Sequence, residues 1–354
     1  SLRSDDASLT AKRDNTKHTE CYKGDYNFHR NALRLLSQRQ NRRYKLRRGL
    51  NNSAKQTIKE TPYYILYSIM NILITGCNGQ LGNEMQLLEK ENPQHQYFNT
   101  DVAQLDITNP EAIEEFVNNN AIDIIVNCAA FTAVDKAESS QELCHLLNAK
   151  APEYLAAAVA KRGGYLVQVS TDYVFDGTNH TPYTEDEATC PNSVYGSTKL
   201  EGEKLAMAAC ANTMIIRTAW LYSTFGNNFV KTMIRLGQEK PELGVIFDQI
   251  GSPTYAGDLA AAIMAAINHG IVPGIYHFSN EGVISWYDFT KAIHRIAGIT
   301  SCHVKPLHTT EYPTPAARPH YSVLDKTKIK QTYGIEIPYW EESLEKCVAK
   351  LLAQ

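Results

Sequence analysis

The stretch that decides the fold is NILITGCNGQLG, residues 71–82. Its first five residues form a nearly continuous apolar run, which is typical of a strand covered on both faces of a sheet. The glycines that follow, Gly76, Gly79 and Gly82, have the spacing Gly-x-x-Gly-x-x-Gly and lead into a helical segment over residues 83–91. Glycines at such a turn permit close backbone approach to a pyrophosphate, while the helix N-terminus supplies N–H groups. The stretch therefore predicts a nucleotide-binding strand–turn–helix rather than an ordinary glycine-containing loop.

The segments downstream alternate between strand-like and helix-like patterns. Further strands are expected over residues 97–100, 123–127, 165–169 and 214–218. Such alternation predicts an α/β fold with a doubly wound parallel sheet, in which ligands bind at the carboxyl ends of the strands. We expect a dinucleotide-binding core over residues 70–220. Residues 221–354 are less regular and are expected to form a smaller C-terminal substrate-binding region, with some elements returning to the core.

The N-terminal residues differ in charge from the rest of the chain. Residues 1–69 contain 15 Lys and Arg against 6 Asp and Glu, a balance of +9. Because the whole chain has a net charge of −3, residues 70–354 have a net charge of −12. Charge blocks of this kind are usually solvated, which favours a disordered or non-native N-terminal extension over a nucleic-acid-binding arm. The acidic remainder argues against a nucleic-acid partner.

Cysteine spacing and hydropathy indicate in which cellular compartment the protein is expected. The chain has eight cysteines but no Cys-x-x-Cys and no His-paired zinc spacing. Reduced thiols and a cytoplasmic location are therefore expected. The N-terminus lacks the apolar core of a signal peptide, and the apolar run over residues 63–75 is shorter than the roughly 20 residues that span a bilayer. We expect neither secretion nor membrane insertion.

The residues predicted to carry the chemistry lie at the fourth strand and the helix after it. Ser170 and Thr171 end the strand, and Tyr195 and Lys199 follow at a spacing that places both on one face of a helix. A phenol titrates near pH ~10, so a nearby cation would make it a more useful acid near neutral pH. The same Tyr-x-x-x-Lys spacing recurs at residues 287–291, but no strand-borne hydroxyl precedes that copy. We therefore favour Tyr195 as the catalytic tyrosine.

Three further residues can be interpreted either as ligand-binding residues or as ordinary structural ones. Asp101 lies about 20 positions past the glycine turn, where a dinucleotide fold binds the adenosine ribose, but it is equally a plain loop aspartate. Trp220 either stacks on a base or sugar or belongs to the core. Arg318, in a proline-rich segment, either clamps a phosphate or is a surface arginine. No arginine occurs between residues 70 and 161 to hold a 2′-phosphate, which argues against strict NADP specificity.

Several motifs, taken in order, resemble those of the dTDP-4-dehydrorhamnose reductases, a family of extended short-chain dehydrogenases/reductases. The resemblance runs from residue 70 almost to the C-terminus and does not include residues 1–69. The motifs are NILITG (71–76), GQLG (79–82), AVDKAE (133–138), STDYVFDG (170–177), YGSTKLEGE (195–203), RTAW (217–220) and PTPAARP (313–319).

The resemblance implies a Rossmann fold and reduction of the C4 ketone of dTDP-4-dehydro-L-rhamnose with NADPH or NADH, giving dTDP-L-rhamnose for surface polysaccharide. It implies that Thr171 hydrogen-bonds the ketone oxygen, that Tyr195 donates the proton, and that Lys199 holds the nicotinamide ribose and lowers the pKa of the tyrosine. The substrate-binding residues it implies are Thr171, Asp172, Trp220 and Arg318. The cofactor-binding residues it implies are Gly76, Gly79, Gln80, Leu81, Gly82, Asp106, Ile107, Ala130, Phe131, Thr132, Tyr195 and Lys199. The adenosine role thereby moves partly from Asp101 to Asp106 and Ile107.

The resemblance leaves metal and oligomeric state open. Some members of the family dimerise through Mg²⁺ bound by acidic residues, and Glu84 and Asp258 match such positions. A full ligand set is not evident in the sequence, so no residue is assigned to a metal, and both a monomer and a homodimer are considered.

Two other functions are compatible with the sequence. A nucleotide-sugar epimerase or dehydratase would keep its NAD tightly bound. A dehydratase would be expected to pair the strand-end hydroxyl with an acidic dyad, whereas here Asp172 is followed by Tyr173. A non-catalytic regulatory subunit could retain the glycine turn, but intact Thr171, Tyr195 and Lys199 favour an enzyme.

Overall fold

A computed structural model of the chain describes residues 69–353. The prediction made for residues 1–69 lies outside this range except at its last residue, and it stays a prediction. Within the described range, no helix combines the length and the apolar composition that crossing a bilayer requires.

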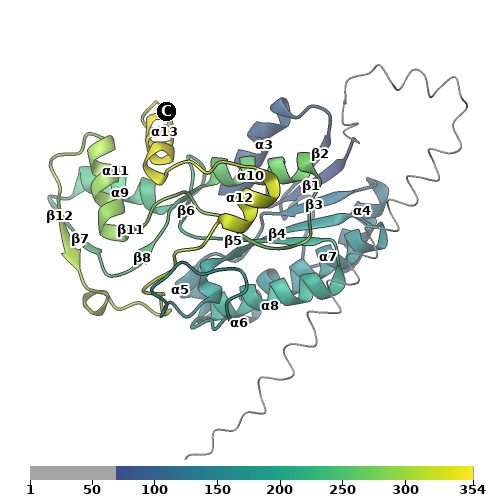
Figure 1. Ribbon diagram of the computed structural model, residues 1–354, viewed down its shortest axis with the longest axis horizontal. Helices are drawn as coiled ribbons and strands as arrows, with labels where there is room; N and C mark the ends of the chain where they lie inside the picture. Colours follow the sequence, from purple (N-terminus) through teal and green to yellow (C-terminus); the bar gives the residue numbers. More distant parts are fainter. Residues whose placement is uncertain (1–68, 354) are drawn as a thin grey trace, which may run out of the picture. The chain divides into compact units, whose positions relative to one another are not determined.

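A six-stranded parallel sheet forms the centre of the described residues (Figure 1). Its strand order is β10-β5-β4-β3-β1-β2, so the chain leaves β1 toward one edge for β2 and then crosses to the other side for β3. This reversal is the topological switch point of a doubly wound sheet, and the predicted fold class is confirmed. The strands are β1 (Asn71–Thr75), β2 (Gln96–Thr100), β3 (Ile124–Asn127), β4 (Tyr165–Thr171), β5 (Thr213–Thr218) and β10 (Gly274–His277).

Helices cover both faces of the sheet. Ile72 and Ile74 of β1 pack on one face, whereas Leu73 packs on the other, because successive side chains of a strand point to opposite faces. Both faces are therefore apolar, which explains the continuous apolar run in the sequence. The first face is covered by α3 (Gln80–Leu88), α10 (Ala256–His269) and α12 (Thr327–Tyr333), and the second by α4 (Pro110–Asn119), α7 (Ala151–Lys161) and α8 (Val194–Ala209).

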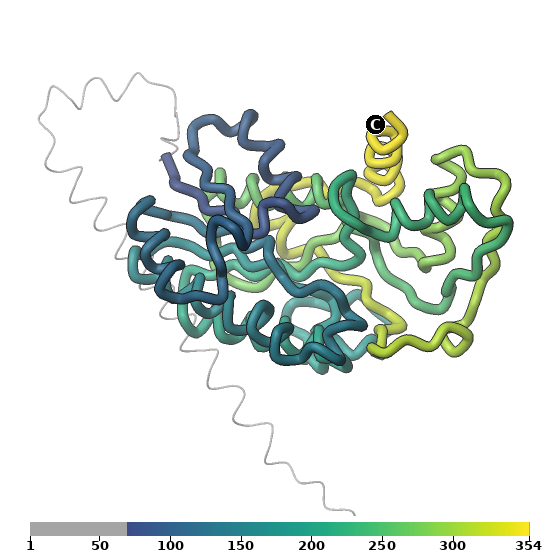
Figure 2. Tube along the Cα trace, turned by 180° about the vertical axis from the view of Figure 1, so that it is seen from behind, coloured from purple at the N-terminus to yellow at the C-terminus, as the bar shows by residue number. Residues whose placement is uncertain are grey.

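Residues after 220 build a further apolar core of their own, which includes Val230, Phe289 and Leu344. Figure 2 shows these segments, green to yellow, gathered mainly at one end of the described part of the chain. β10, α10 and α12 return to the central sheet and its helices, while the boundary at residue 220 stays a prediction. The elements of this region are α9 (Phe229–Glu239), α11 (Trp286–Ile296), α13 (Trp340–Leu352), and the strand pairs β6 (Leu221–Tyr222) with β9 (Thr254–Tyr255), β7 (Glu242–Ile246) with β12 (His303–Leu307) and β8 (Ile250–Gly251) with β11 (Ile284–Ser285).

Short elements join the strands to the helices. The segment between β3 and α7 is helical in three pieces, of which the last is a π-helix running directly into α7. The single-turn helix after β4 begins where Thr171 ends the strand. These elements are η1 (Glu89–Glu91), α5 (Val134–Ala137), α6 (Gln141–His145), η2 (Leu146–Lys150), η3 (Asp172–Val174) and η4 (Thr309–Glu311).

Candidate functional site

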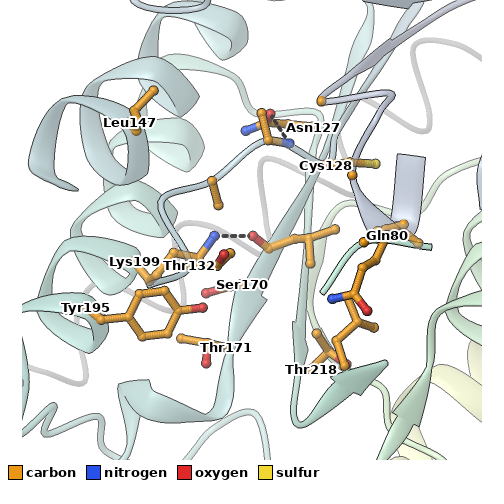
Figure 3. Close-up of a pocket in the computed structure, with 18 of the residues that line it drawn as sticks. Gln80, Asn127, Cys128, Thr132, Leu147, Ser170, Thr171, Tyr195, Lys199 and Thr218 are labelled. Atoms are coloured by element: carbon orange, nitrogen blue, oxygen red, sulfur yellow. Dashed lines mark hydrogen bonds between the residues drawn. The ribbon is translucent and has the colours of Figure 1, made fainter. Parts of the chain in front are cut away.

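A cavity of about 770 Å³ opens at the carboxyl ends of β1, β3, β4 and β5. It lies at the switch point between β1 and β3, where doubly wound sheets bind their ligands. Residues from the glycine turn, the strand ends and α8 line it together (Figure 3). Residues of the C-terminal region, such as Trp286, complete the lining. Most of the residues predicted for the site therefore face one space.

The glycine turn has the geometry that its sequence predicts. Gly76 has φ +62, and a Cβ atom there would lie 2.8 Å from the backbone of Ala129. A Cβ on Gly82 would collide with the carbonyl oxygen of Gly76, so α3 can approach β1 only with glycine at this position. Gly82 is buried by this packing and does not line the cavity, whereas Gly76, Gly79, Gln80 and Leu81 do.

The start of α3 leaves donors for an anionic ligand. Gly79 precedes the helix without a side-chain cap, and no acidic residue occupies the first turn. The first N–H groups of a helix have no partner within it, and the helix dipole favours negative charge there. The glycine turn and the first N–H groups of α3 form a cradle with no room for a side chain at its tight turn. The cradle fits the pyrophosphate of a dinucleotide.

Both candidates for the adenosine end line the cavity. Asp101 follows β2, and its carboxylate accepts hydrogen bonds from the backbone N–H of Asn78 (3.2 Å) and of Val102 (2.8 Å). Asp106 accepts from the N–H of Thr108 (2.9 Å) and from its hydroxyl (2.7 Å), and these bonds lower the pKa of Asp106. Ile107 lines the cavity beside it. The geometry thus keeps both acidic residues as candidates.

The loop after β3 is fixed by a buried asparagine that the sequence interpretation missed. Asn148 on η2 is 1% exposed, and its side chain both accepts from the N–H of Phe131 (2.8 Å) and donates to its carbonyl oxygen (3.0 Å). Ala130 and Thr132 line the cavity, but Phe131 does not. No local signal distinguishes Asn148 in the sequence, because the helical stretch around it, residues 141–153, contains several other polar residues.

Thr171, Tyr195 and Lys199 meet at this cavity, as predicted. The Thr171 hydroxyl donates to the Asp172 carboxylate at 2.9 Å and accepts from the backbone N–H of Tyr173 at 3.2 Å. Lys199 is 4% exposed, and its Nζ atom donates to the carbonyl oxygen of Val169 at 2.6 Å. Figure 3 shows the tyrosine hydroxyl directed toward the end of β4, where Thr171 lies, with the lysine amine reaching the neighbouring strand backbone.

α8 is held rigidly enough to place its side chains. Ser193 caps its N-terminus by accepting from the N–H of Gly196 at 3.1 Å. Gly196 packs directly under the carbonyl oxygen of Tyr173, where a Cβ atom would collide. The start of the helix is therefore locked onto the segment that follows β4, so Tyr195 and Thr171 have a fixed relationship.

Burial dominates the electrostatics of the site. It raises the pKa of Tyr195; the nearby Thr171 hydroxyl opposes this rise, and the Asp172 charge adds to it. Burial also lowers the pKa of Lys199 to about 8, which Glu203 opposes, and raises the pKa of Asp172 to about 6. The net shift at Tyr195 is upward in the protein alone, opposite to the lowering implied by the resemblance. It keeps the phenol protonated near neutral pH, which is the form that a proton donor requires.

Of the predicted substrate-binding residues, Trp220 and Asp172 line the cavity, whereas Arg318 does not. Trp220 lines the cavity with its ring stacked on Trp286, with a centroid distance of 3.6 Å and an interplanar angle of 12°. Arg318 does not line the cavity, because its guanidinium forms a bidentate ion pair with Asp135, at 3.0 and 2.8 Å. Asp172 lines the cavity and is 2% exposed.

Two other cavity residues were not singled out from the sequence. Trp286 begins α11, which also contains the second Tyr-x-x-x-Lys copy; neither Tyr287 nor Lys291 lines the cavity. Asn228 caps α9 and donates to the side-chain oxygen of Gln80 at 3.0 Å, which joins the C-terminal region to the glycine turn. No local sequence pattern connects positions so far apart.

The acidic residues considered for Mg²⁺ have other partners. Glu84 is 4% exposed and accepts from the Ser223 hydroxyl at 2.6 Å. Asp258 accepts from the side-chain amide of Asn280 at 2.6 Å and from the Ser343 hydroxyl. Residues 69–353 contain no group of three or more His, Cys, Asp or Glu side chains placed to hold a metal ion. The donor set of a magnesium site is thus not assembled, and we derive no catalytic step from one.

Comparison with known proteins agrees with this geometry. The family profile described as "RmlD substrate binding domain" matches residues 70–353, which include every residue of the cavity. The chain belongs to this family. The match begins where the predicted nucleotide-binding core begins, one residue before β1.

Members of the family are similar to this chain over nearly their full length. A dTDP-4-dehydrorhamnose reductase from Escherichia coli strain K12 is 42% identical over 295 residues, which cover 80% of this chain and 98% of the relative. A solved dTDP-4-dehydrorhamnose reductase from Clostridium acetobutylicum is 46% identical with a TM-score of 0.77, covering 80% of this chain and 100% of that one. The enzyme of the same name from Bacillus anthracis, solved with NADP, is 40% identical with a TM-score of 0.77 and covers 80% and 99%.

More distant solved structures share the fold alone. They include a dTDP-glucose 4,6-dehydratase at 17% identity and a UDP-glucose 4-epimerase at 18%, with TM-scores of 0.68 and 0.69. This likeness agrees with the extended short-chain dehydrogenase/reductase fold.

Proposed function

We propose that this chain reduces the C4 ketone of dTDP-4-dehydro-L-rhamnose to dTDP-L-rhamnose with NADPH or NADH. One observation carries the proposal: Thr171, Tyr195 and Lys199 converge on the cavity into which the glycine turn opens. The names of relatives at about 40% identity, and the NADP in one solved relative, point to the same reaction.

The cofactor would be held by the cradle of the glycine turn and the start of α3. Asp101, or Asp106 with Ile107, would bind the adenosine ribose, and Ala130 and Thr132 would leave room beside the end of β3. A reduced nicotinamide bound there would supply a hydride, two electrons with one hydrogen, to the ketone carbon. Lys199 has three N–H donors and uses one on Val169, so others are available to the nicotinamide ribose.

The proton for the ketone oxygen would come from Tyr195. Its raised pKa keeps it protonated until charge develops on the oxygen. The buried Lys199 ammonium, which lines the same cavity, would stabilise the phenolate that remains. The Thr171 hydroxyl has a single proton, which points at Asp172 in the protein alone. Rotation of this hydroxyl would allow it to donate to the ketone oxygen instead.

The remaining expectations concern the sugar nucleotide and the setting of the enzyme. Asp172 and Trp220 would contact the sugar nucleotide, while Arg318 would have to leave Asp135 to bind a phosphate. We infer a cytoplasmic enzyme that binds no nucleic acid, supported by the acidic balance of residues 70–354. It would act as a monomer or a homodimer.

NAD(P)H oxidation by the purified protein with a panel of dTDP-4-keto sugars tests the proposal. Tyr195→Phe should lower kcat by about 10²- to 10⁴-fold, the usual contribution of a general acid, with cofactor affinity largely kept. Tyr287→Phe is the matched control, because it has the same spacing to a lysine but lies outside the cavity lining, and it should leave kcat unchanged. Unchanged turnover in Tyr195→Phe would refute the catalytic assignment.

The same assay separates the alternatives. Tightly bound NAD without net consumption would indicate an epimerase or dehydratase. A protein that consumes neither NADPH nor NADH with any of the sugars would indicate a non-catalytic subunit. Stoichiometric consumption of NADPH or NADH with one sugar supports the reductase.

A further inference from the structure

The backbone of Trp220 has a conformation that bulky side chains rarely adopt. Its φ is +48, in the left-handed region, which is strained for a residue other than glycine. The carbonyl oxygen of Trp220 accepts from the backbone N–H of Thr254 at 3.2 Å, and the next residue, Leu221, pairs with Thr254 between β6 and β9. The surrounding strands therefore hold this conformation in place and direct the indole to the cavity.

A second indole supports the first. Trp286 stacks on Trp220 at a centroid distance of 3.6 Å, and both rings line the cavity. Trp286 is itself fixed, since it is the first residue of α11, between Ser285 and Asp288 of the capping box, and the ring centroid of Phe229 lies 4.6 Å from its own. The stacking surface is thus part of a rigid aromatic cluster rather than a mobile side chain.

A glycine leaves the space that the indole of Trp220 occupies. A Cβ atom on Gly251 would lie 2.7 Å from Cε2 and 2.8 Å from Cζ2 of that indole, closer than carbon atoms approach without displacement. Gly251 pairs with Ile284 between β8 and β11, and Trp286 begins α11 directly after β11. One small strand pair therefore anchors both the glycine and the stacking ring. A side chain at Gly251 would therefore crowd the indole of Trp220, and also Oγ of Ser322, which would lie 2.8 Å from the Cβ atom.

We propose that Trp286 and Gly251 are positioning residues for the sugar nucleotide, because together they fix the indole of Trp220 in the orientation that it presents to the cavity. This inference rests on the proposed function. Neither residue needs to touch Thr171, Tyr195 or Lys199, so the two should affect recognition of the sugar more than the chemical step. A rigid, preorganised indole binds a flat or apolar sugar face without the entropic cost of ordering it.

The test compares Trp286→Leu, Trp286→Phe and Gly251→Ala with the unmodified chain. The assay is NADPH oxidation with dTDP-4-dehydro-L-rhamnose, with KM for the sugar, KM for NADPH and kcat measured separately. Trp286→Leu and Gly251→Ala should each raise the KM for the sugar about five- to tenfold, as expected for loss of one aromatic contact, with KM for NADPH and kcat changed less than about twofold. Trp286→Phe should restore most of the sugar affinity, because a phenyl ring still stacks.

Gly244→Ala is the matched control for the glycine. Gly244 lies in β7 of the same region, outside the cavity lining, and the three atoms nearest to its Cβ would all belong to the flexible side chain of Leu307. It should leave the KM for the sugar unchanged, even if thermal stability falls.

Three results would overturn the inference while the proposed function stands. They are an unchanged sugar KM in Trp286→Leu, an equal rise in both KM values, and a Trp286→Phe variant as impaired as Trp286→Leu. Failure of the unmodified chain to oxidise NADPH with any 4-keto sugar would instead overturn the proposed function, and this inference with it.

Discussion

The Nζ atom of Lys199 donates a 2.6 Å hydrogen bond to the carbonyl oxygen of Val169, which fixes an almost fully buried amine at the cavity that the Tyr195 phenol also lines. Val169 lies in β4, two residues before Thr171, so one strand positions both the lysine and the hydroxyl. A single carbonyl oxygen replaces little of the hydration that an ammonium group loses on burial. Burial accordingly lowers the pKa of Lys199 to about 8.

This burial predicts that Lys199→Met makes the ligand-free protein more stable near pH 7 while abolishing its activity. An unfolded lysine titrates near pH ~10.4, so the folded protein binds fewer protons than the unfolded chain between pH 8 and 10.4. The cost of the buried charge is full below pH 8 and vanishes as the pH rises past about 10.4. We expect a gain on the order of 2 kcal/mol at pH 7 that shrinks toward pH 10.

Denaturant unfolding of both proteins at pH 7 and pH 10 measures this difference. Lys204→Met is the control, because Lys204 lies on the same helix but is exposed, and it should change stability little at either pH. A Lys199→Met protein that is less stable than the unmodified chain at pH 7 would contradict the prediction.

A buried ion pair one helical turn further along α8 predicts a different mutational pattern. Glu203 and Arg217 are 1% and 2% exposed, and Oε2 of Glu203 lies 2.7 Å from Nη2 of Arg217 in β5. Arg217→Met would leave a buried carboxylate unpaired, at a cost of about 3–5 kcal/mol. Replacing both residues by Met should recover most of this loss, because burying an ion pair is itself costly.

A double-mutant cycle from denaturant unfolding tests this expectation. The exposed pair of Arg235 with Glu239 serves as the comparison, and its coupling should not exceed about 0.5 kcal/mol. Glu203 also opposes the lowering of the Lys199 pKa, so Glu203→Gln should lower that pKa further. A double variant as unstable as Arg217→Met would show that the loss does not come from the unpaired charge.

Local sequence patterns predicted the elements that carry the chemistry. The apolar run of β1, the glycines of the turn and the strand-end hydroxyl of Thr171 each depend on positions close in sequence. The strand that precedes Tyr195 distinguished this Tyr-x-x-x-Lys copy from the second copy at residues 287–291. The structure places only the Tyr195 copy on the cavity. Period and spacing suffice for such features, because a strand or helix turns its side chains at a fixed repeat.

Side-chain partners distant in sequence could not be predicted in this way. Arg318 pairs with Asp135 across 183 positions, so a surface arginine and a phosphate clamp looked alike in the sequence. The stacking of Trp220 on Trp286 depends on strand pairs of only two residues, such as β8 with β11, which carry no readable alternation. These contacts depend on tertiary packing, which no local pattern encodes.

We expect Asp101, the acidic residue that follows β2, to influence the choice between NADPH and NADH. The Asp101 carboxylate is held beside the glycine turn by the N–H of Asn78, and it would repel a 2′-phosphate. Asp101→Ser should therefore raise the ratio of kcat/KM for NADPH to that for NADH severalfold. Asp106→Ser provides the comparison, because both residues line the cavity. If the ratio changes only in Asp106→Ser, the role at the adenosine end belongs to Asp106. If the ratio changes in neither variant, neither carboxylate determines the cofactor preference.

The ion pair of Asp135 with Arg318 ties the proline-rich segment 312–319 to α5. The Asp135 carboxylate accepts from both terminal nitrogens of Arg318 and from the backbone N–H of Ala316, and hydrogen bonding to Arg318 lowers the pKa of Asp135. We expect Asp135→Asn and Arg318→Ala to increase hydrogen exchange in this segment alike, and to raise the KM for the sugar nucleotide by similar factors. Arg318→Lys should restore little, because an ammonium cannot form the bidentate pair.

The two variants also decide between a tether and a phosphate clamp. If Arg318 leaves Asp135 to bind the diphosphate of the substrate, Arg318→Ala should raise the KM far more than Asp135→Asn, which frees the guanidinium for that role. A tether predicts equal effects, with a coupling of about 0.5 kcal/mol in the stability of the ligand-free protein, because the pair is partly exposed. Unequal KM values together with unchanged exchange over residues 312–319 would contradict the tether and assign Arg318 to the substrate.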